Sequence, residues 1–169
     1  VRTAEKVDTK RKTVFLKGNK KLAYDRLLIA TGARPKLPAI PGLDADSLYI
    51  LRTALDAREL KTTAEKARRV VVLGGGMVGI KTATALRRLP NPPEVTLVEQ
   101  EDHILPLRLD SEGAGIVQTA LESGGIRIIT NGAVRKVIRK PGRAATLFLT
   151  GNRKLTADLI VAAIGVRPN

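Results

Sequence analysis

The stretch Val70–Gly79, VVVLGGGMVG, decides the fold, because an apolar strand runs directly into a glycine-rich turn. Gly74, Gly76 and Gly79 in this stretch fit the spacing G-x-G-x-x-G. A helical pattern follows the turn, and a second apolar strand, Val95–Glu99, then ends in an acid. Strand, turn, helix, strand and acid in this order predict a unit that binds a dinucleotide.

Each glycine of the turn has a physical reason in such a unit. Gly74 lets the chain turn sharply off the strand, Gly76 lets the backbone approach a pyrophosphate closely, and Gly79 lets the helix pack tightly on the strand. The first N–H groups of the helix and the helix dipole then favour negative charge at this end. The candidate residues for the pyrophosphate are Gly74, Gly75, Gly76, Met77, Val78 and Gly79.

Glu99 is the candidate residue for the adenosine ribose. Its carboxylate would accept hydrogen bonds from the ribose hydroxyls and would repel a 2′-phosphate, so we expect NAD(H) to be preferred over NADP(H). The alternative is a glycine-rich turn that binds no ligand. The complete order of elements favours the dinucleotide site over this alternative.

The composition limits the classes of protein. A chain of 169 residues with 43% hydrophobic and 2% aromatic residues can bury one core built from aliphatic side chains. It contains no cysteine and a single histidine, His103, so we expect no disulfide and no metal site. No apolar run reaches the length of a membrane span, and the first residues lack the apolar stretch of a signal peptide. We therefore expect a cytoplasmic protein without a membrane partner.

The net charge of +14 has two interpretations. It favours either attraction to an anionic partner, such as an acidic electron-carrier protein, a nucleic acid or the cofactor, or simply a solvated surface rich in Lys and Arg. Two Tyr and two Phe offer almost no stacking platform for single strands, which argues against a nucleic-acid partner.

The first third of the chain predicts a small β structure and a linker. Residues 13–24 alternate apolar and polar side chains around Gly18-Asn19, which predicts a β-hairpin. The unbroken apolar run Leu27–Ala30 predicts a buried strand. The proline-rich segment 35–42 predicts a linker, and residues 52–67 have a helical pattern.

The residues after Glu99 predict the rest of the domain. A loop over 102–109 precedes a helix that Asp110 or Ser111 can cap and that Gly124-Gly125 can end. The remaining predicted elements are a third parallel strand over 126–130, an antiparallel pair over 134–138 and 144–150, and a final strand over 159–163. We expect an α/β fold: a Rossmann-type three-layer domain with a parallel sheet and a small antiparallel β meander.

Several motifs together resemble a known family. They are Tyr24–Gly32 (YDRLLIATG), Pro41-Gly42, the glycine turn, Val95–Glu99 and Ala163–Asn169 (AIGVRPN). This series is similar to the FAD-dependent pyridine nucleotide-disulfide oxidoreductases, and most similar to their NADH oxidase, nitrite reductase and ferredoxin reductase-like branch. The resemblance spans essentially the whole chain.

The resemblance implies a division into domains, because in that family an NAD(P)H-binding domain interrupts an FAD-binding domain. Residues 1–35 resemble part of the FAD domain, residues 36–156 the NAD(P)H domain, and residues 157–169 the return to the FAD domain. The chain thus resembles an excerpt that would pair with the remainder of the FAD domain. FAD is then expected in the full-length parent.

The resemblance also implies further site residues. Thr31 and Gly32 would lie near the flavin, and Gly165 near the nicotinamide. Lys81 stands where many relatives have a glutamate near the nicotinamide ribose, so it is either a surface lysine or a residue near the cofactor. The low-molecular-weight thioredoxin reductase branch is excluded, because it requires cysteines that this sequence lacks.

The function implied is that of the NAD(P)H-binding portion of a flavin enzyme, which passes hydride from NADH to FAD and on to an unknown acceptor. No residue is assigned as catalytic, because the two cofactors would carry the chemistry. Two alternatives are a stand-alone, non-catalytic NAD(H)-binding module and a basic interaction protein with a degenerate nucleotide pocket.

Overall fold

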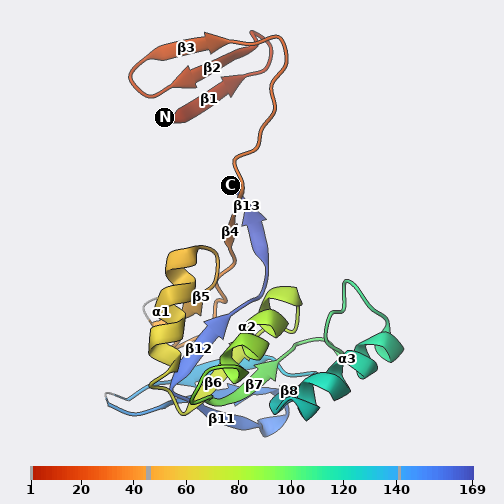
Figure 1. The fold of residues 1–169 in the computed structure, drawn as a ribbon. Coiled ribbons are helices and arrows are strands. Elements are labelled where there is room, and N and C mark those ends of the chain that lie inside the picture. The colour runs from red at the N-terminus through yellow and green to blue at the C-terminus, as the bar shows by residue number, and fades with distance from the viewer. Residues whose placement is uncertain (1, 45–46, 141) are drawn as a thin grey trace. The chain divides into compact units, whose positions relative to one another are not determined.

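The computed structural model describes residues 2–44, 47–140 and 142–169. Their contacts divide the chain into two compact units, Val1–Gly32 and Ala33–Asn169. Among the described residues, the first unit contains one sheet and the second contains three, and no sheet combines strands of both units (Figure 1).

The first unit is a three-stranded antiparallel sheet of β1 (Ala4–Asp8), β2 (Thr13–Leu16) and β3 (Lys20–Ala23). The hairpin predicted over 13–24 is confirmed, since β2 pairs with β3. Gly18 and Asn19 form its turn with φ values of 84° and 58°. The strand β1 could not be predicted from the sequence, because a strand with mostly exposed side chains lacks an apolar pattern.

The prediction of a buried strand at Leu27–Ala30 is wrong. These residues form no strand and are exposed, with Leu28 at 87% and Ile29 at 68% of full accessibility. An apolar run becomes a buried strand only if another strand pairs with it and another layer covers it. The described residues provide neither for this segment.

The second unit is built on a five-stranded parallel sheet in the order β5-β12-β6-β7-β8. Its strands are β5 (Tyr49–Ile50), β12 (Leu159–Ala162), β6 (Arg69–Leu73), β7 (Glu94–Val98) and β8 (Ile126–Ile129). The predicted strands are confirmed, whereas β5 is too short to produce a sequence pattern. The strands are mostly apolar because both faces of the sheet are covered.

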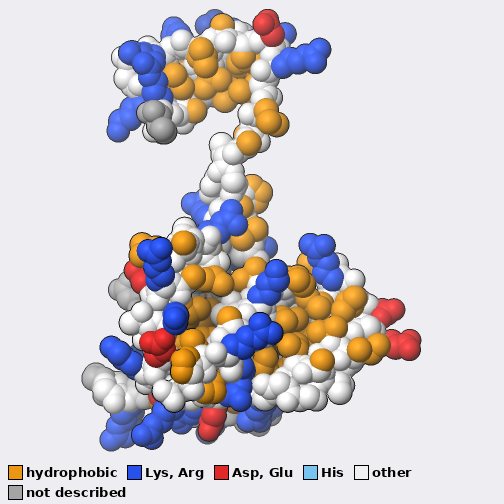
Figure 2. All heavy atoms as spheres, in the orientation of Figure 1, with side chains coloured by type: hydrophobic (Ala, Val, Ile, Leu, Met, Phe, Trp, Pro, Cys, Tyr) orange, Lys and Arg blue, Asp and Glu red, His pale blue; other side chains and the backbone are white. Residues whose placement is uncertain are grey.

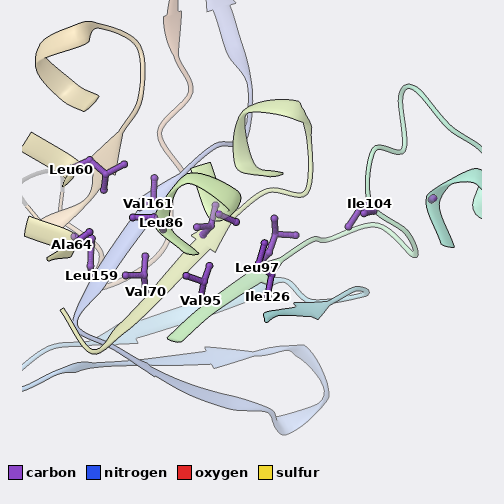
Figure 3. Close-up of a cluster of buried hydrophobic side chains, with 13 residues drawn as sticks. Leu60, Ala64, Val70, Leu86, Val95, Leu97, Ile104, Ile126, Leu159 and Val161 are labelled. Atoms are coloured by element: carbon purple, nitrogen blue, oxygen red, sulfur yellow. The ribbon is translucent and has the colours of Figure 1, made fainter. Parts of the chain in front are cut away.

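Three helices cover one face of this sheet: α1 (Ala54–Ala64), α2 (Met77–Arg87) and α3 (Ser111–Ser123). A capping box formed by Thr53 and Asp56 begins α1, and the Asp110 side chain caps α3. The helices and the sheet enclose one core, whose side chains are drawn in Figure 3.

A three-stranded antiparallel sheet covers the other face. It consists of β9 (Val134–Ile138), β10 (Ala145–Leu149) and β11 (Lys154–Ala157), with a short 3-10 turn, η2 (Thr150–Asn152), before β11. The two sheets enclose a second core. The predicted three-layer architecture with an antiparallel meander is therefore confirmed, although β11 itself had not been predicted.

The first and last strands of the second unit pair with each other. β4 (Ala33–Pro35) precedes β5 in the sequence, β13 (Val166–Pro168) follows β12, and the two form an antiparallel two-stranded sheet. Within the segment 157–169, β12 lies between β5 and β6 in the parallel sheet. The domain boundaries 1–35, 36–156 and 157–169 remain predictions from the family resemblance.

Candidate functional site

The turn after β6 begins at Gly74, where the backbone has a φ of +105°. A Cβ atom here would lie 2.5 Å from the carbonyl oxygen of Ala163 and 2.9 Å from its carbonyl carbon. The Gly74 N–H also donates to the carbonyl of Val98 at the end of β7, at 2.8 Å. Both the conformation and the close approach of the chain after β12 therefore require glycine at this position.

Gly79 is required by packing instead. It lies in the first turn of α2, and a Cβ atom on it would lie 1.9 Å from the carbonyl oxygen of Gly74. Only glycine lets the helix approach the turn this closely.

Gly76 differs from both of these glycines. Its φ of −76° is ordinary, and a Cβ atom on it would meet nothing within 4 Å. The fold itself therefore does not require glycine here. The open space beside Gly76 lies at the position where the glycine motif predicts a pyrophosphate.

The N-terminus of α2 is also suited to an anion. Gly76 is its N-cap and supplies no side-chain hydrogen bond, and the first turn contains no acidic residue. The Met77 and Val78 side chains are about half exposed, at 49% and 48%. The first N–H groups of the helix therefore have no side-chain acceptor at the cap, where the helix dipole is positive.

Glu99 lies directly after β7, and its side chain turns toward the glycine turn. One carboxylate oxygen, Oε2, accepts the Gly75 N–H at 2.6 Å. The other, Oε1, accepts the N–H groups of Gln100 and Glu101 at 2.6 and 3.0 Å. The residue is only 8% exposed. The structure thus brings Glu99 and the glycine turn together, and it adds a structural role that the sequence did not reveal.

The loop after Glu99 covers the same turn. The N–H of Leu105 donates to the carbonyl of Gly75 at 2.9 Å, and Ile104 is completely buried. A Cβ atom on Gly75 would lie 3.1 Å from Ile104 and 3.0 Å from the Glu99 carboxylate. Sequence reasoning missed Ile104 and Leu105, although two adjacent apolar residues within a polar loop were the available signal.

His103 connects two residues of this loop, Asp102 and Leu109. Its Nδ1 contacts the Asp102 carboxylate, and its Nε2 lies 3.2 Å from the carbonyl oxygen of Leu109. Because both neighbours are acceptors, a doubly protonated imidazolium satisfies both contacts. The hydrogen bond to Asp102 raises the pKa of His103 above its usual value.

The other candidates are more dispersed. Lys81 is exposed on α2. Gly165 has a φ of +98°, and its carbonyl accepts the Lys36 N–H at 2.9 Å. Thr31 and Gly32 belong to the first unit and the glycine turn to the second, so the structure does not assign them to one site.

The described part of the chain offers neither a metal site nor a membrane-spanning helix. It contains no group of three or more His, Cys, Asp or Glu side chains that could hold a metal ion. Within that same part, no helix combines the length and the apolar character needed to cross a membrane.

The chain was compared with known proteins. It is 34% identical over 158 residues to the NADH-dependent phenylglyoxylate dehydrogenase subunit epsilon of Aromatoleum evansii, covering 94% of this chain and 37% of the relative. It is likewise 34% identical over 165 residues to the NADH oxidase of Methanocaldococcus jannaschii, covering 96% of this chain and 36% of the relative. The chain therefore spans little more than a third of these curated relatives.

A solved structure, that of a NAD-dependent persulfide reductase from A. fulgidus, is similar over 99% of this chain and 31% of its own, with a TM-score of 0.84 and 34% identity. The profile of the family described as "Pyridine nucleotide-disulphide oxidoreductase" matches residues 1–169. The match covers the whole length, including the glycine turn and the strand that ends in Glu99. The chain belongs to the pyridine nucleotide-disulphide oxidoreductase family.

Proposed function

We propose that residues Gly74–Gly79 bind the pyrophosphate of NADH. The observation that carries this proposal is the contrast among the three glycines. Packing requires Gly74 and Gly79, whereas Gly76 is bordered by open space and lies at the N-terminus of α2. At the N-terminus of a helix, a glycine that the fold does not need leaves room for a ligand that approaches the backbone closely.

Glu99 gives this site its preference for NADH over NADPH. Its carboxylate is held next to the glycine turn by three backbone N–H groups. A negative charge fixed at this place accepts ribose hydroxyls and repels a 2′-phosphate. The names of two relatives, an NADH-dependent dehydrogenase subunit and an NADH oxidase, support this preference.

The whole protein is then an oxidoreductase that passes hydride from NADH to FAD and on to an acceptor. In this proposal Lys81 and Gly165 lie toward the nicotinamide, and Thr31 and Gly32 toward the flavin. The nicotinamide and the flavin supply the redox chemistry when they are bound. The residues of this chain hold the dinucleotide, orient it and discriminate between its phosphorylated and unphosphorylated forms.

The test is a calorimetric titration of the 169-residue chain with NADH and with NADPH at one salt concentration, together with a visible spectrum for bound flavin. Tighter binding of NADH than of NADPH supports the proposed site. If the chain binds NADH and neither the chain nor the full-length parent contains flavin, the stand-alone NAD(H)-binding module is identified instead. Absence of binding by either nucleotide, in a chain that unfolds cooperatively, overturns the proposal and favours the basic interaction protein.

A further inference from the structure

One sheet of the chain carries basic side chains and no acidic ones. All charged side chains between Glu122 and Asp158 are basic. This segment contains the whole β9-β10-β11 meander. In Figure 2, Lys and Arg side chains gather at the lower edge of the second unit, where Figure 1 labels β11. The acidic side chains Asp56, Glu59 and Glu112 lie instead on α1 and α3, in the helical layer.

The alternation of buried and less buried side chains along β10 shows which residues lie on the outward face of the meander. Ala145, Leu147 and Leu149 of β10 point into the second core and are at most 5% exposed. Because side chains alternate along a strand, Thr146 and Phe148 point outward. Phe148 thus lies at the middle of the uncovered face.

Lysines flank this ring on both neighbouring strands. Phe148 pairs with Lys136 on β9 and with Lys154 on β11, so the three side chains form one row across the sheet. The ammonium group of Lys154 lies 5.3 Å from the centre of the Phe148 ring. Both lysines are exposed.

The β9-β10 hairpin extends this row. Arg139 and Lys140 follow β9, Arg143 precedes β10, and all three are exposed. The ion pairs found among the described residues, Arg69–Asp158 and Asp102–His103, leave these side chains out. The basic side chains of this surface therefore take part in neither of these two ion pairs.

We propose that this surface docks a protein that presents a patch of Asp and Glu side chains. We call it the basic face and define it by Lys136, Arg139, Lys140, Arg143, Phe148 and Lys154. A sheet face with an aromatic ring between two lysines matches the anatomy of a protein interface with complementary charge. A nucleic-acid strand would need several rings for successive bases, whereas the basic face has one, and Lys154 lies over it.

This inference does not depend on the nucleotide proposal. The basic face shares no residue with the glycine turn or with Glu99, and it belongs to the layer on the other side of the parallel sheet from α2. Failure of one proposal therefore leaves the other unchanged.

The test uses poly-L-glutamate as the acidic probe, added to the isotope-labelled 169-residue chain while backbone amide NMR signals are followed. We expect salt-sensitive shifts concentrated on β9, β10 and β11. The double variant Lys136→Gln/Lys154→Gln is expected to weaken binding by about five-fold. The matched control Arg58→Gln/Lys61→Gln removes the same charge from exposed positions on α1 and is expected to bind as the unchanged chain does.

Equal weakening by the two double variants would mean that net charge alone attracts the probe, and the proposal would fail. Tighter binding of single-stranded poly(A) than of poly-L-glutamate, with the same amides shifted, would also overturn it in favour of a nucleic-acid surface. If the Lys136/Lys154 variant lowers the urea midpoint, Arg139→Gln/Lys140→Gln at the hairpin end gives the same test outside the paired strands.

Discussion

Two alanine substitutions in one glycine motif are expected to affect different properties, one the binding of NADH and the other the stability of the fold. Gly76→Ala adds a methyl group that meets nothing within 4 Å, at an N-cap with an ordinary φ of −76°. Alanine is a poorer N-cap than glycine, and this difference is the main cost of the substitution. Gly76→Ala is therefore expected to lower the free energy of unfolding by no more than about 1 kcal/mol. The same methyl group enters the space proposed for the pyrophosphate.

The expected loss of NADH binding follows from overpacking. An extra methyl group in a close-packed site costs roughly 1–3 kcal/mol. For Gly76→Ala this corresponds to a roughly 5- to 150-fold increase in the dissociation constant of NADH. Gly79→Ala differs, because its methyl group would lie 1.9 Å from the Gly74 carbonyl oxygen, where ordinary contact begins at 3.4 Å. The Gly74 carbonyl belongs to the backbone and cannot rotate away, so overpacking toward the upper end of roughly 1–3 kcal/mol outweighs the gain of about 1 kcal/mol in helix propensity. Gly79→Ala is therefore expected to destabilise the fold.

The assay combines urea unfolding with calorimetric titration of NADH for both variants. Gly115→Ala is the control, since Gly115 is exposed in α3 and a Cβ atom there would meet nothing within 4 Å. It is expected to stabilise the chain by up to about 1 kcal/mol and to leave NADH binding unchanged. The reasoning is refuted if Gly76→Ala binds NADH as tightly as the unsubstituted chain, or if it destabilises the fold as much as Gly79→Ala.

Three further outcomes are expected. Glu99→Gln replaces one acceptor oxygen by an amide donor that faces backbone N–H groups, so the free energy of unfolding, measured in urea, is expected to fall by about 1–3 kcal/mol. Partial burial raises the pKa of Asp158, but hydrogen bonds from Arg69 outweigh this effect and lower the pKa below its usual range. The stability that this carboxylate contributes is present above the usual Asp range and is lost as the pH falls through the lowered pKa, so urea midpoints should fall less with pH in Asp158→Asn. His103 is the single histidine, so its NMR titration should give a raised pKa, which Asp102→Asn is expected to lower. The stabilising contribution of His103 is present below about pH 6.5 and is lost as the pH rises through the raised pKa. An unchanged pKa of His103 in Asp102→Asn would contradict the assigned cause.

Local signals were enough to predict most of the second unit. The glycine turn, the strands around it and the caps of α3 depend on residues close together in the sequence, and the structure confirms them. Two apolar runs show the limit of such signals. Leu159–Ala162 is buried between β5 and β6, whereas Leu27–Ala30 has a similar composition and is exposed. Burial depends on strands from elsewhere in the chain, and a run of apolar residues does not reveal whether those strands are present.

The site shows the same limit at the level of single residues. The position of Glu99 after an apolar strand predicts its place beside the glycine turn, because neighbouring parallel strands end at one edge of the sheet. The three N–H groups that its carboxylate accepts depend on how the turn and the following loop fold. Ile104 and Leu105 contribute through the same loop, where no periodic pattern exists to mark them.

The structure also separates two reasons for glycine that a sequence motif combines. At Gly74 and Gly79 a side chain would collide with the backbone of the protein itself, so glycine is explained without any ligand. At Gly76 the folded protein leaves room for a side chain, and no contact explains why one is missing. Glu99 has the converse property, since its three backbone hydrogen bonds explain a carboxylate there even without a ribose. Gly76 is therefore the stronger evidence for nucleotide binding, and Glu99 bears on specificity only through a direct comparison of NADH with NADPH.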